Sequence, residues 1–281
     1  MDRAQLVQQI KKKRSFLCVG LDTDLEKIPE HLKNTEDPLL DFNKKVVDAT
    51  VPYTVAYKPN IAFYEALGSY GISALKETIS YIKTNYPEVF VILDAKRGDI
   101  GNTSDMYAKS AFDFFKADAI TVAPYMGSDS VIPFLQYPEK WVVLLALTSN
   151  KGSEDFQHLI VNPETGERLF ERTIRTALTW GDDNNLMFVV GATQSKYIEA
   201  IRDIAPKSFL LVPGIGAQGG DFEEVCKYGM NEDCGLLVNV SRSLIYCDSS
   251  TLFEEKIVEQ ARLLQIKMET ALREQGFSDS Q

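Results

Sequence analysis

The sequence predicts an α/β protein, a single-domain (β/α)8 TIM barrel that spans residues 1–281. Eight short apolar runs are separated by segments with helical periodicity, and the runs start about 31 residues apart, the length of one strand-plus-helix unit. No stretch between them is rich enough in Pro, Gly and Ser to be a domain linker. An open doubly wound sheet remains the alternative, because a count of strands does not show closure.

Each apolar run stays apolar until its last residues, as expected for parallel strands that are buried on both faces. The predicted strands are Phe16–Asp22, Tyr53–Asn60, Val89–Lys96, Ala119–Tyr125, Val142–Thr148, Leu186–Thr193, Phe209–Ile215 and Gly235–Arg242.

The segments between the strands carry helix signals. Asp37 followed by Pro38 is typical of an N-cap with proline in the first turn. The last segment has apolar residues at three- and four-residue steps with charges elsewhere, which predicts an amphipathic helix. The other predicted helices are Gly71–Asn85, Thr103–Lys116, Gly166–Trp180, Ser195–Ala205 and Asp221–Tyr228, and the last one is Thr251–Gln275.

Composition excludes several classes of protein. The 281 residues are 44% hydrophobic and 25% charged, which is ordinary for a globular protein, and the net charge of −10 argues against nucleic-acid binding. The basic stretch at 11–14 precedes too short an apolar run for a signal peptide, and no segment is long enough for a membrane span. Four cysteines without C-x-x-C spacing predict reduced, mostly buried thiols in a cytoplasmic protein, with a metal site as the lesser alternative.

Charged and polar residues gather where the predicted strands end. In a barrel these ends form the catalytic face, although a single such residue is more often an ordinary solvated strand end. Five of the eight strands share the pattern, which favours a catalytic cleft. The residues are Asp22, Lys58, Asp94, Lys96, Thr148, Ser149 and Arg242.

The third strand leads into the motif with the most chemistry, DAKRGDIGNT at 94–103. Alternation places Asp94 and Lys96 on one face, Asp99 lies in the following turn, and Lys58 ends the neighbouring strand. Two carboxylates and two ammoniums could form an alternating chain that titrates as a unit. A purely structural salt-bridge network is the alternative.

The last two units predict a phosphate site. The seventh strand leads into a loop with Gly214, Gly216 and Gln218, and Asp221 opens the next helix. Glycine amides approach an anion closely, and Arg242 after the eighth strand can hold phosphate oxygens with two hydrogen bonds. Barrels often place phosphate at this position, whereas the G-x-G alone could be a tight turn.

Together these features resemble the orotidine 5'-monophosphate decarboxylase family, in its longer-chain branch. The resemblance rests on the ten-residue motif, the KPN at 58–60, Asp22, and the PGIG loop with Arg242, and it covers about residues 16–246. It implies a homodimeric (β/α)8 barrel that converts orotidine monophosphate to uridine monophosphate and CO2, the last step of pyrimidine nucleotide synthesis, without cofactor or metal.

The resemblance also implies roles for individual residues. Lys96 corresponds to the lysine that delivers a proton to pyrimidine C6, and Asp94 to the carboxylate beside the leaving group. Asp99 and Thr103 correspond to the pair that the partner subunit supplies. Lys58 and Asp22 correspond to the residues that hold the ribose hydroxyls and complete the charge chain, and Lys58 is thereby a catalytic residue. The other substrate-binding positions are Ser149 for the pyrimidine, and Gly214, Gly216, Gln218 and Arg242 for the phosphate.

Two rival functions stay open. A magnesium-dependent phosphosugar decarboxylase of the same superfamily, such as the ketogulonate phosphate decarboxylases, also shows D-x-K-x-x-D, and a phosphate-binding barrel without catalysis is the second rival. The long segment from Ser149 to about Thr165 is a candidate active-site cover or a mere surface insertion.

Overall fold

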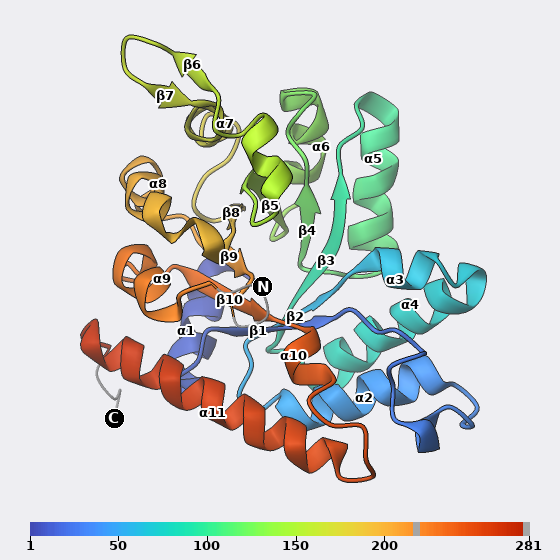
Figure 1. Ribbon diagram of the computed structural model, residues 1–281. Coiled ribbons are helices and arrows are strands. Elements are labelled where there is room, and N and C mark those ends of the chain that lie inside the picture. The colour runs from blue at the N-terminus through green and yellow to red at the C-terminus, as the bar shows by residue number, and fades with distance from the viewer. Residues whose placement is uncertain (216–219, 278–281) are drawn as a thin grey trace.

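The computed structural model describes residues 1–215 and 220–277, and these ranges form a closed barrel of eight parallel strands (Figure 1). Around the barrel the order is β1, β2, β3, β4, β5, β8, β9 and β10, and β10 pairs with β1. The predicted barrel is confirmed, and the open-sheet alternative is wrong. The strands are β1 (Leu17–Leu21), β2 (Ala56–Pro59), β3 (Phe90–Arg97), β4 (Ala119–Val122), β5 (Trp141–Leu147), β8 (Leu186–Val190), β9 (Leu210–Pro213) and β10 (Leu236–Val240).

Helices cover the outside of the barrel, and each predicted helix has a counterpart. The longer ones are α2 (Pro38–Thr50), α4 (Gly68–Asn85), α5 (Gly101–Lys109), α7 (Leu169–Ala177), α8 (Ile198–Ile204), α9 (Phe222–Gly229) and α11 (Phe253–Glu274). Short helical segments not predicted from the sequence are α3 (Ile61–Glu65), α6 (Ile132–Leu135) and α10 (Arg242–Ile245). Single-turn or π-helical segments are η1 (Glu30–Leu32), η2 (Ser110–Phe114), η3 (Ser128–Ser130), η4 (Lys151–Asp155) and η5 (Ala192–Tyr197).

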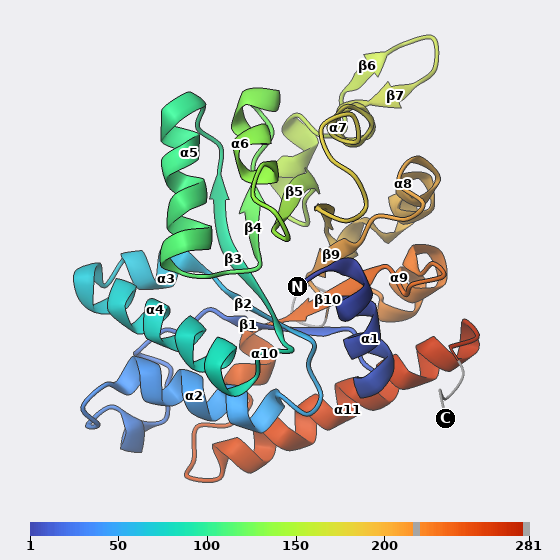
Figure 2. The ribbon, with the colours of Figure 1, turned by 180° about the vertical axis from the view of Figure 1, so that it is seen from behind.

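A further helix, α1 (Arg3–Lys13), lies across the amino-terminal end of the barrel (Figure 2). Asp2 caps it, because its carboxylate accepts from the Gln5 amide at 2.8 Å while the Gln5 side chain accepts from the Asp2 amide. The indole of Trp141 donates to the Met1 carbonyl oxygen at 2.9 Å. Sequence reasoning missed this helix, although the Asp2–Gln5 spacing is a capping signal.

The barrel strands are almost entirely buried, which is why they read as continuous apolar runs. The amphipathic face predicted for the last helix also packs inward: Ile257, Ala261 and Met268 of α11 are fully buried. Burial of apolar surface on both sides of the sheet is the main source of stability in such a layered fold. The strand ends are therefore held in fixed relative positions by the core beneath them.

The long segment after β5 has two parts. Its first part lies at the mouth of the barrel, and its second part forms a small antiparallel hairpin of β6 (Ile160–Asn162) and β7 (Glu167–Arg168). The hairpin projects away from the barrel (Figure 1). Only the first part is placed where it could contact a ligand.

The described residues bear on two expectations, the absence of a membrane span and the state of the cysteines. Within 1–215 and 220–277 no helix is long and apolar enough to cross a membrane. All four cysteines are free thiols, and three of them, Cys18, Cys226 and Cys234, are buried.

Candidate active site

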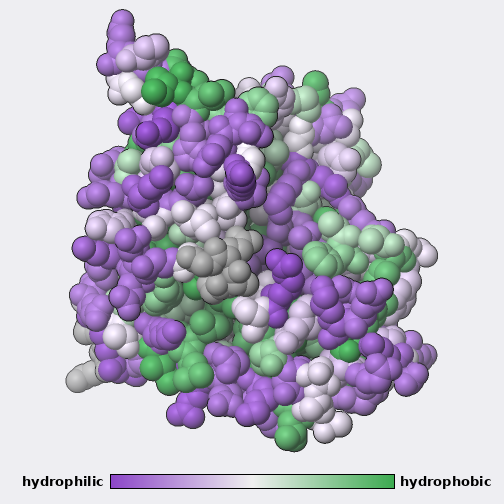
Figure 3. Space-filling view, in the orientation of Figure 1, coloured by the Kyte–Doolittle hydropathy of each residue, from purple (hydrophilic) through white to green (hydrophobic). Residues whose placement is uncertain are grey.

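A cavity of about 510 Å³ opens at the carboxyl ends of the barrel strands. This end of the barrel faces the viewer in Figure 3, where hydrophilic side chains surround a central hollow. Seven of the residues predicted for the site line the cavity: Asp22, Lys58, Asp94, Lys96, Ser149, Gly214 and Arg242.

Asp94 lies at the centre of the charged cluster. Its Oδ2 accepts a hydrogen bond from Lys58 Nζ at 2.8 Å, and its Oδ1 accepts from Lys96 Nζ at 2.6 Å. Lys58 Nζ also lies 4.0 Å from Asp22 Oδ1. An alternating chain of two carboxylates and two ammoniums therefore exists, but its second carboxylate is Asp22 and not Asp99, which the sequence pattern had placed in it.

Neighbouring opposite charges hold Asp94 and Lys58 in their ionised forms. Burial by itself raises the pKa of the Asp94 carboxyl, but the ammoniums of Lys58 and Lys96 outweigh it and hold that pKa well below its ordinary value. Burial likewise lowers the pKa of Lys58, and the carboxylates of Asp94 and Asp22 overcome it so that the net shift is upward. Asp94 is a carboxylate and Lys58 an ammonium throughout the neutral range.

Asp22 presents an unused acceptor to the cavity. Its Oδ2 accepts from the Ser241 hydroxyl at 2.9 Å, whereas its buried Oδ1 accepts no hydrogen bond within the described residues. A buried acceptor without a donor is costly, and a ligand hydroxyl would satisfy it. Asp22 therefore fits a position that binds a polyhydroxylated ligand.

Ser149 reaches the cavity because β8 approaches it closely. A Cβ on Gly191 would meet the Ser149 backbone nitrogen at 2.6 Å, so only glycine allows this contact after β8. The Thr193 hydroxyl donates to the Ser149 carbonyl oxygen at 3.2 Å and fixes the same loop. Asn150 and Gln157 from this loop line the cavity too, and Gln157 accepts from the Thr148 amide at 2.8 Å.

The phosphate end of the predicted site is described in part. Gly214 follows β9 with φ +99°, a conformation that favours glycine, and it lines the cavity with Arg242 at the start of α10. Arg242 is exposed, and among the described residues it makes no ion pair. Gly216 and Gln218 lie outside the described residues.

Asp99 and Thr103 do not line the cavity of their own chain. Asp99 Oδ1 accepts from the Ile100 amide at 2.8 Å, and Thr103 is exposed on α5. Exposed apolar side chains neighbour them in the sequence: Ile100 follows Asp99 and is 46% exposed, and Met106 lies one helical turn after Thr103 and is 64% exposed. A single chain thus leaves these two predicted residues away from the site.

Sequence reasoning missed several polar residues of the cavity wall, among them Thr121 and Asn239. Thr121 of β4 donates to Asp94 Oδ1 at 2.9 Å, and nothing in the run AITV distinguishes it from an ordinary strand threonine. Asn239 of β10 is 8% exposed, and its Oδ1 has no hydrogen-bond partner in the described ranges. An asparagine inside the apolar run LLVNV was the signal that could have identified it.

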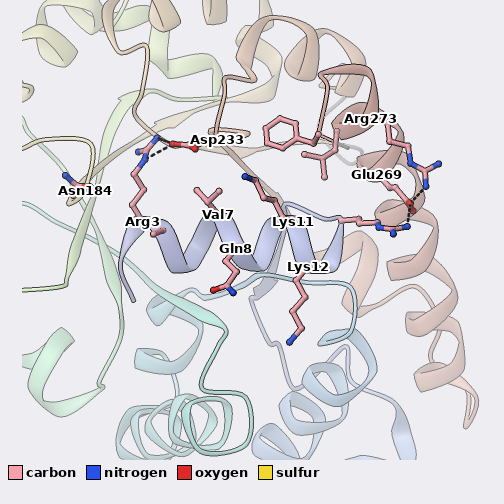
Figure 4. Close-up of a pocket in the computed structure, with 13 residues that line it drawn as sticks. Arg3, Val7, Gln8, Lys11, Lys12, Asn184, Asp233, Glu269 and Arg273 are labelled. Atoms are coloured by element: carbon pink, nitrogen blue, oxygen red, sulfur yellow. Dashed lines mark hydrogen bonds and ion pairs between the residues drawn. The ribbon is translucent and has the colours of Figure 1, made fainter. Parts of the chain in front are cut away.

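A second cavity, of about 820 Å³, lies between α1 and the end of α11 (Figure 4). Its charged groups largely satisfy one another: Arg3 pairs with Asp233 at 3.0 Å, and Glu269 receives Arg14 at 2.8 Å and Arg273 at 2.7 Å. It lies away from the strand carboxyl ends and holds no cluster comparable to that around Asp94. Size alone therefore does not identify the active site.

Metal ligation was the lesser possibility raised by the cysteines. Across the parts of the chain that the structure describes, no group of three or more His, Cys, Asp or Glu side chains is arranged to hold a metal ion.

Several known proteins are similar to this chain in sequence or in fold. The family described as "Orotidine 5'-phosphate decarboxylase / HUMPS family" matches residues 15–249. An orotidine 5'-phosphate decarboxylase of Phocaeicola vulgatus is 59% identical over 269 residues, covering 96% of this chain and 98% of the relative. One from Parabacteroides distasonis is 58% identical over 277 residues, covering 99% and 98%. The solved structure of Leishmania donovani OMP decarboxylase has a TM-score of 0.78 and 38% identity, and covers 95% of this chain and 99% of its own.

Proposed function

The chain belongs to the orotidine 5'-phosphate decarboxylase / HUMPS family, and we propose that it converts orotidine 5'-phosphate to uridine 5'-phosphate and CO2, with Lys96 as the proton donor. This is the last step of uridine monophosphate synthesis. The relatives that carry this activity in their names match nearly the whole chain.

One observation supports the chemistry above all others: Asp94 is shared between Lys58 and Lys96 at the floor of the cavity. The pairing directs the Lys96 Nζ toward the side of the cavity where Asp94 lies. Half of the Lys96 side chain is exposed, at 52%, so its ammonium remains accessible to a ligand.

The reaction needs what this cluster can supply. Loss of CO2 from C6 of the pyrimidine leaves an electron pair in the ring plane that the π-system cannot delocalise, and enzymes lower such barriers by about 8 to 23 kcal/mol. The Lys96 ammonium attracts that developing charge, and its proton then forms the new C–H bond at C6, leaving a neutral amine that solvent reprotonates. Asp94 beside the departing carboxylate disfavours the bound substrate more than the transition state.

Other residues of the cavity hold the parts of the substrate that do not react. Asp22, with its unused Oδ1, and Lys58 suit the ribose hydroxyls, and Ser149 suits the pyrimidine edge. Arg242 and the amides near Gly214 suit the phosphate, together with Gly216 and Gln218. Phosphate contacts distant from C6 supply binding energy that favours the closed, reactive complex.

We propose that the active form is a homodimer whose partner supplies Asp99 and Thr103. Both residues lie outside the cavity of their own chain, and the exposed apolar side chains of Ile100, beside Asp99, and Met106, one helical turn after Thr103, suit contact with a second copy. In the same proposal the chain acts as one catalytic domain over residues 1–281, in the cytoplasm, where its thiols remain reduced.

A decarboxylation assay with a chelator present tests the function. We expect the absorbance of orotidine 5'-phosphate to fall at the same rate with and without EDTA. Activity that requires added Mg²⁺, on this substrate or on a phosphosugar acid, would favour the magnesium-dependent rival. Binding of uridine 5'-phosphate without turnover would favour the non-catalytic one.

A further inference from the structure

The strand that carries Asp94 contains an irregularity in its pairing with the next strand. Strand β3 pairs with β4 through Leu93 and Ile120, and again through Arg97 and Val122, so three β3 residues stand opposite one β4 residue. That one residue is Thr121. A bulge of this kind re-aims side chains and leaves backbone groups outside the regular ladder.

The Thr121 hydroxyl satisfies the groups that the bulge leaves unpaired. Its Oγ1 accepts from the Ala95 amide at 2.9 Å and from the Lys96 amide at 2.8 Å. Its hydrogen goes to Asp94 Oδ1 at 2.9 Å. A hydroxyl has one hydrogen and two lone pairs, so it can donate one hydrogen bond and accept two. Thr121 makes all three of these bonds, one with each of three consecutive residues of β3.

The conformation that these bonds hold is unusual. Lys96 has φ +46°, in the left-handed region that residues with a Cβ seldom adopt. Thr121 itself is 1% exposed, so water does not offer a substitute for its hydroxyl. The left-handed turn brings Lys96 Nζ back to within 2.6 Å of the carboxylate two residues earlier.

From these contacts we propose that Thr121 is a positioning residue of the active site, which fixes both the backbone of Lys96 and the carboxylate of Asp94 in the geometry that proton delivery requires. The proposal rests on the function assigned above. Thr121 contacts neither the reacting carbon nor the transferred proton, and it acts through the two residues that do. A small displacement of a reacting group is enough to slow catalysis by about a hundredfold.

Replacement of the hydroxyl by a methyl group tests the proposal. For Thr121→Val we expect kcat to fall by about 10- to 100-fold with KM changed by less than about threefold, because the binding residues stay in place. Thr121→Ser keeps the hydroxyl and is expected to restore kcat to within about threefold of the unmodified enzyme. Rates are expressed per site that binds uridine 5'-phosphate, counted by calorimetry, so that a misfolded fraction does not lower the apparent kcat.

Thr54→Val is the matched control. Thr54 is equally buried, and its hydroxyl donates to the Leu17 carbonyl oxygen at 2.8 Å, away from the cavity. We expect this variant to lose stability with an unchanged kcat. If Thr121→Val does not accumulate as folded protein, Thr121→Cys preserves its volume with a weaker donor and acceptor and is expected to lower kcat in the same direction.

The results that would overturn the proposal are distinct from a failure of the assigned function. Unmodified enzyme that does not decarboxylate orotidine 5'-phosphate would refute the function. With active unmodified enzyme, a Thr121→Val kcat within about twofold of normal, a Thr121→Ser variant as impaired as Thr121→Val, or a change in KM alone would refute the positioning role.

Discussion

Lys58 Nζ and Asp94 Oδ2 lie 2.8 Å apart, and both side chains are buried in the wall of the barrel. Removing two charges from water is costly, and the cost is recovered here only because each charge has a partner of opposite sign. A second ammonium, Lys96 Nζ, lies 2.6 Å from Asp94 Oδ1. Its side chain is 52% exposed and lines the cavity, so a ligand can reach this charge, whereas Lys58 is buried.

Removal of the proton donor should abolish turnover without unfolding the chain. Lys96→Ala is expected to lower kcat by more than about a thousandfold, because both charge attraction and proton delivery are lost. Its thermal unfolding should remain cooperative. Lys267→Ala, on the exposed face of α11, is the matched control and should retain full activity. Near-normal turnover of purified Lys96→Ala would contradict the assignment.

Asp94→Asn should destabilise the protein in a pH-dependent way. The change leaves Lys58 buried with only the more distant Asp22, so we expect a loss of about 3 kcal/mol in the free energy of unfolding at pH 7. The pKa of Asp94 is lower in the folded chain than in the unfolded one, so the stability it contributes is present above about pH 4 and lost as pH falls toward the folded value.

The unmodified protein and Asp94→Asn should therefore differ less in their free energy of unfolding below about pH 4 than at pH 7. Denaturant unfolding at several pH values measures this difference. Asp203→Asn, an exposed carboxylate on α8, serves as the control and should show no such pH dependence. If the two proteins differ in unfolding free energy by the same amount from pH 7 to pH 3, Asp94 is not an ionised, paired carboxylate.

Two inactive variants should complement each other if the sites are shared. Mixing Lys96→Ala with Asp99→Ala gives, after subunit exchange, mixed dimers that hold one site with both residues intact. Half of the dimers are then mixed and half of their sites are active, so about one quarter of the normal activity is expected. Mixtures that stay inactive, although subunit exchange is demonstrated by mass spectrometry, would exclude the partner's contribution.

Arg242 should matter for the phosphate and not for the nucleoside. Arg242→Gln removes charge-assisted hydrogen bonds of about 1.5 to 3 kcal/mol, so the Kd for uridine 5'-phosphate should rise by about 10- to 100-fold. Weak binding of uridine should be unchanged. Arg262→Gln on α11 is the control, and calorimetry measures all three proteins. An equal loss of affinity for uridine would place Arg242 elsewhere on the ligand.

The sequence predicted the barrel and most of the site because both follow from local patterns. Buried parallel strands are continuous apolar runs, and Asp94 and Lys96 interrupt such a run at its end. Helix α1 was missed because its apolar residues are few and short helices depend on tertiary packing.

The contacts of Thr121 could not be predicted because they depend on a register shift between two strands. The periodicity of apolar residues in a sequence does not reveal such a shift. The same holds for the unused acceptor of Asp22, since burial and partners on other strands decide it. Asp99 and Thr103 carry a strong sequence signal, yet a single chain does not bring them to the cavity. The proposed homodimer would supply them from the partner subunit.

The bulge in β3 has a consequence for the timing of the catalytic cycle. Lys96 is attached to the barrel wall on both sides: Thr121 holds its amide, and the Arg97 carbonyl oxygen accepts from the Ala123 amide at 2.7 Å. Proteins commonly carry reactive groups on loops that must close before each turnover. Here the backbone that carries the ammonium belongs to the barrel wall, so the proton donor does not need a loop to close before it is brought to the cavity.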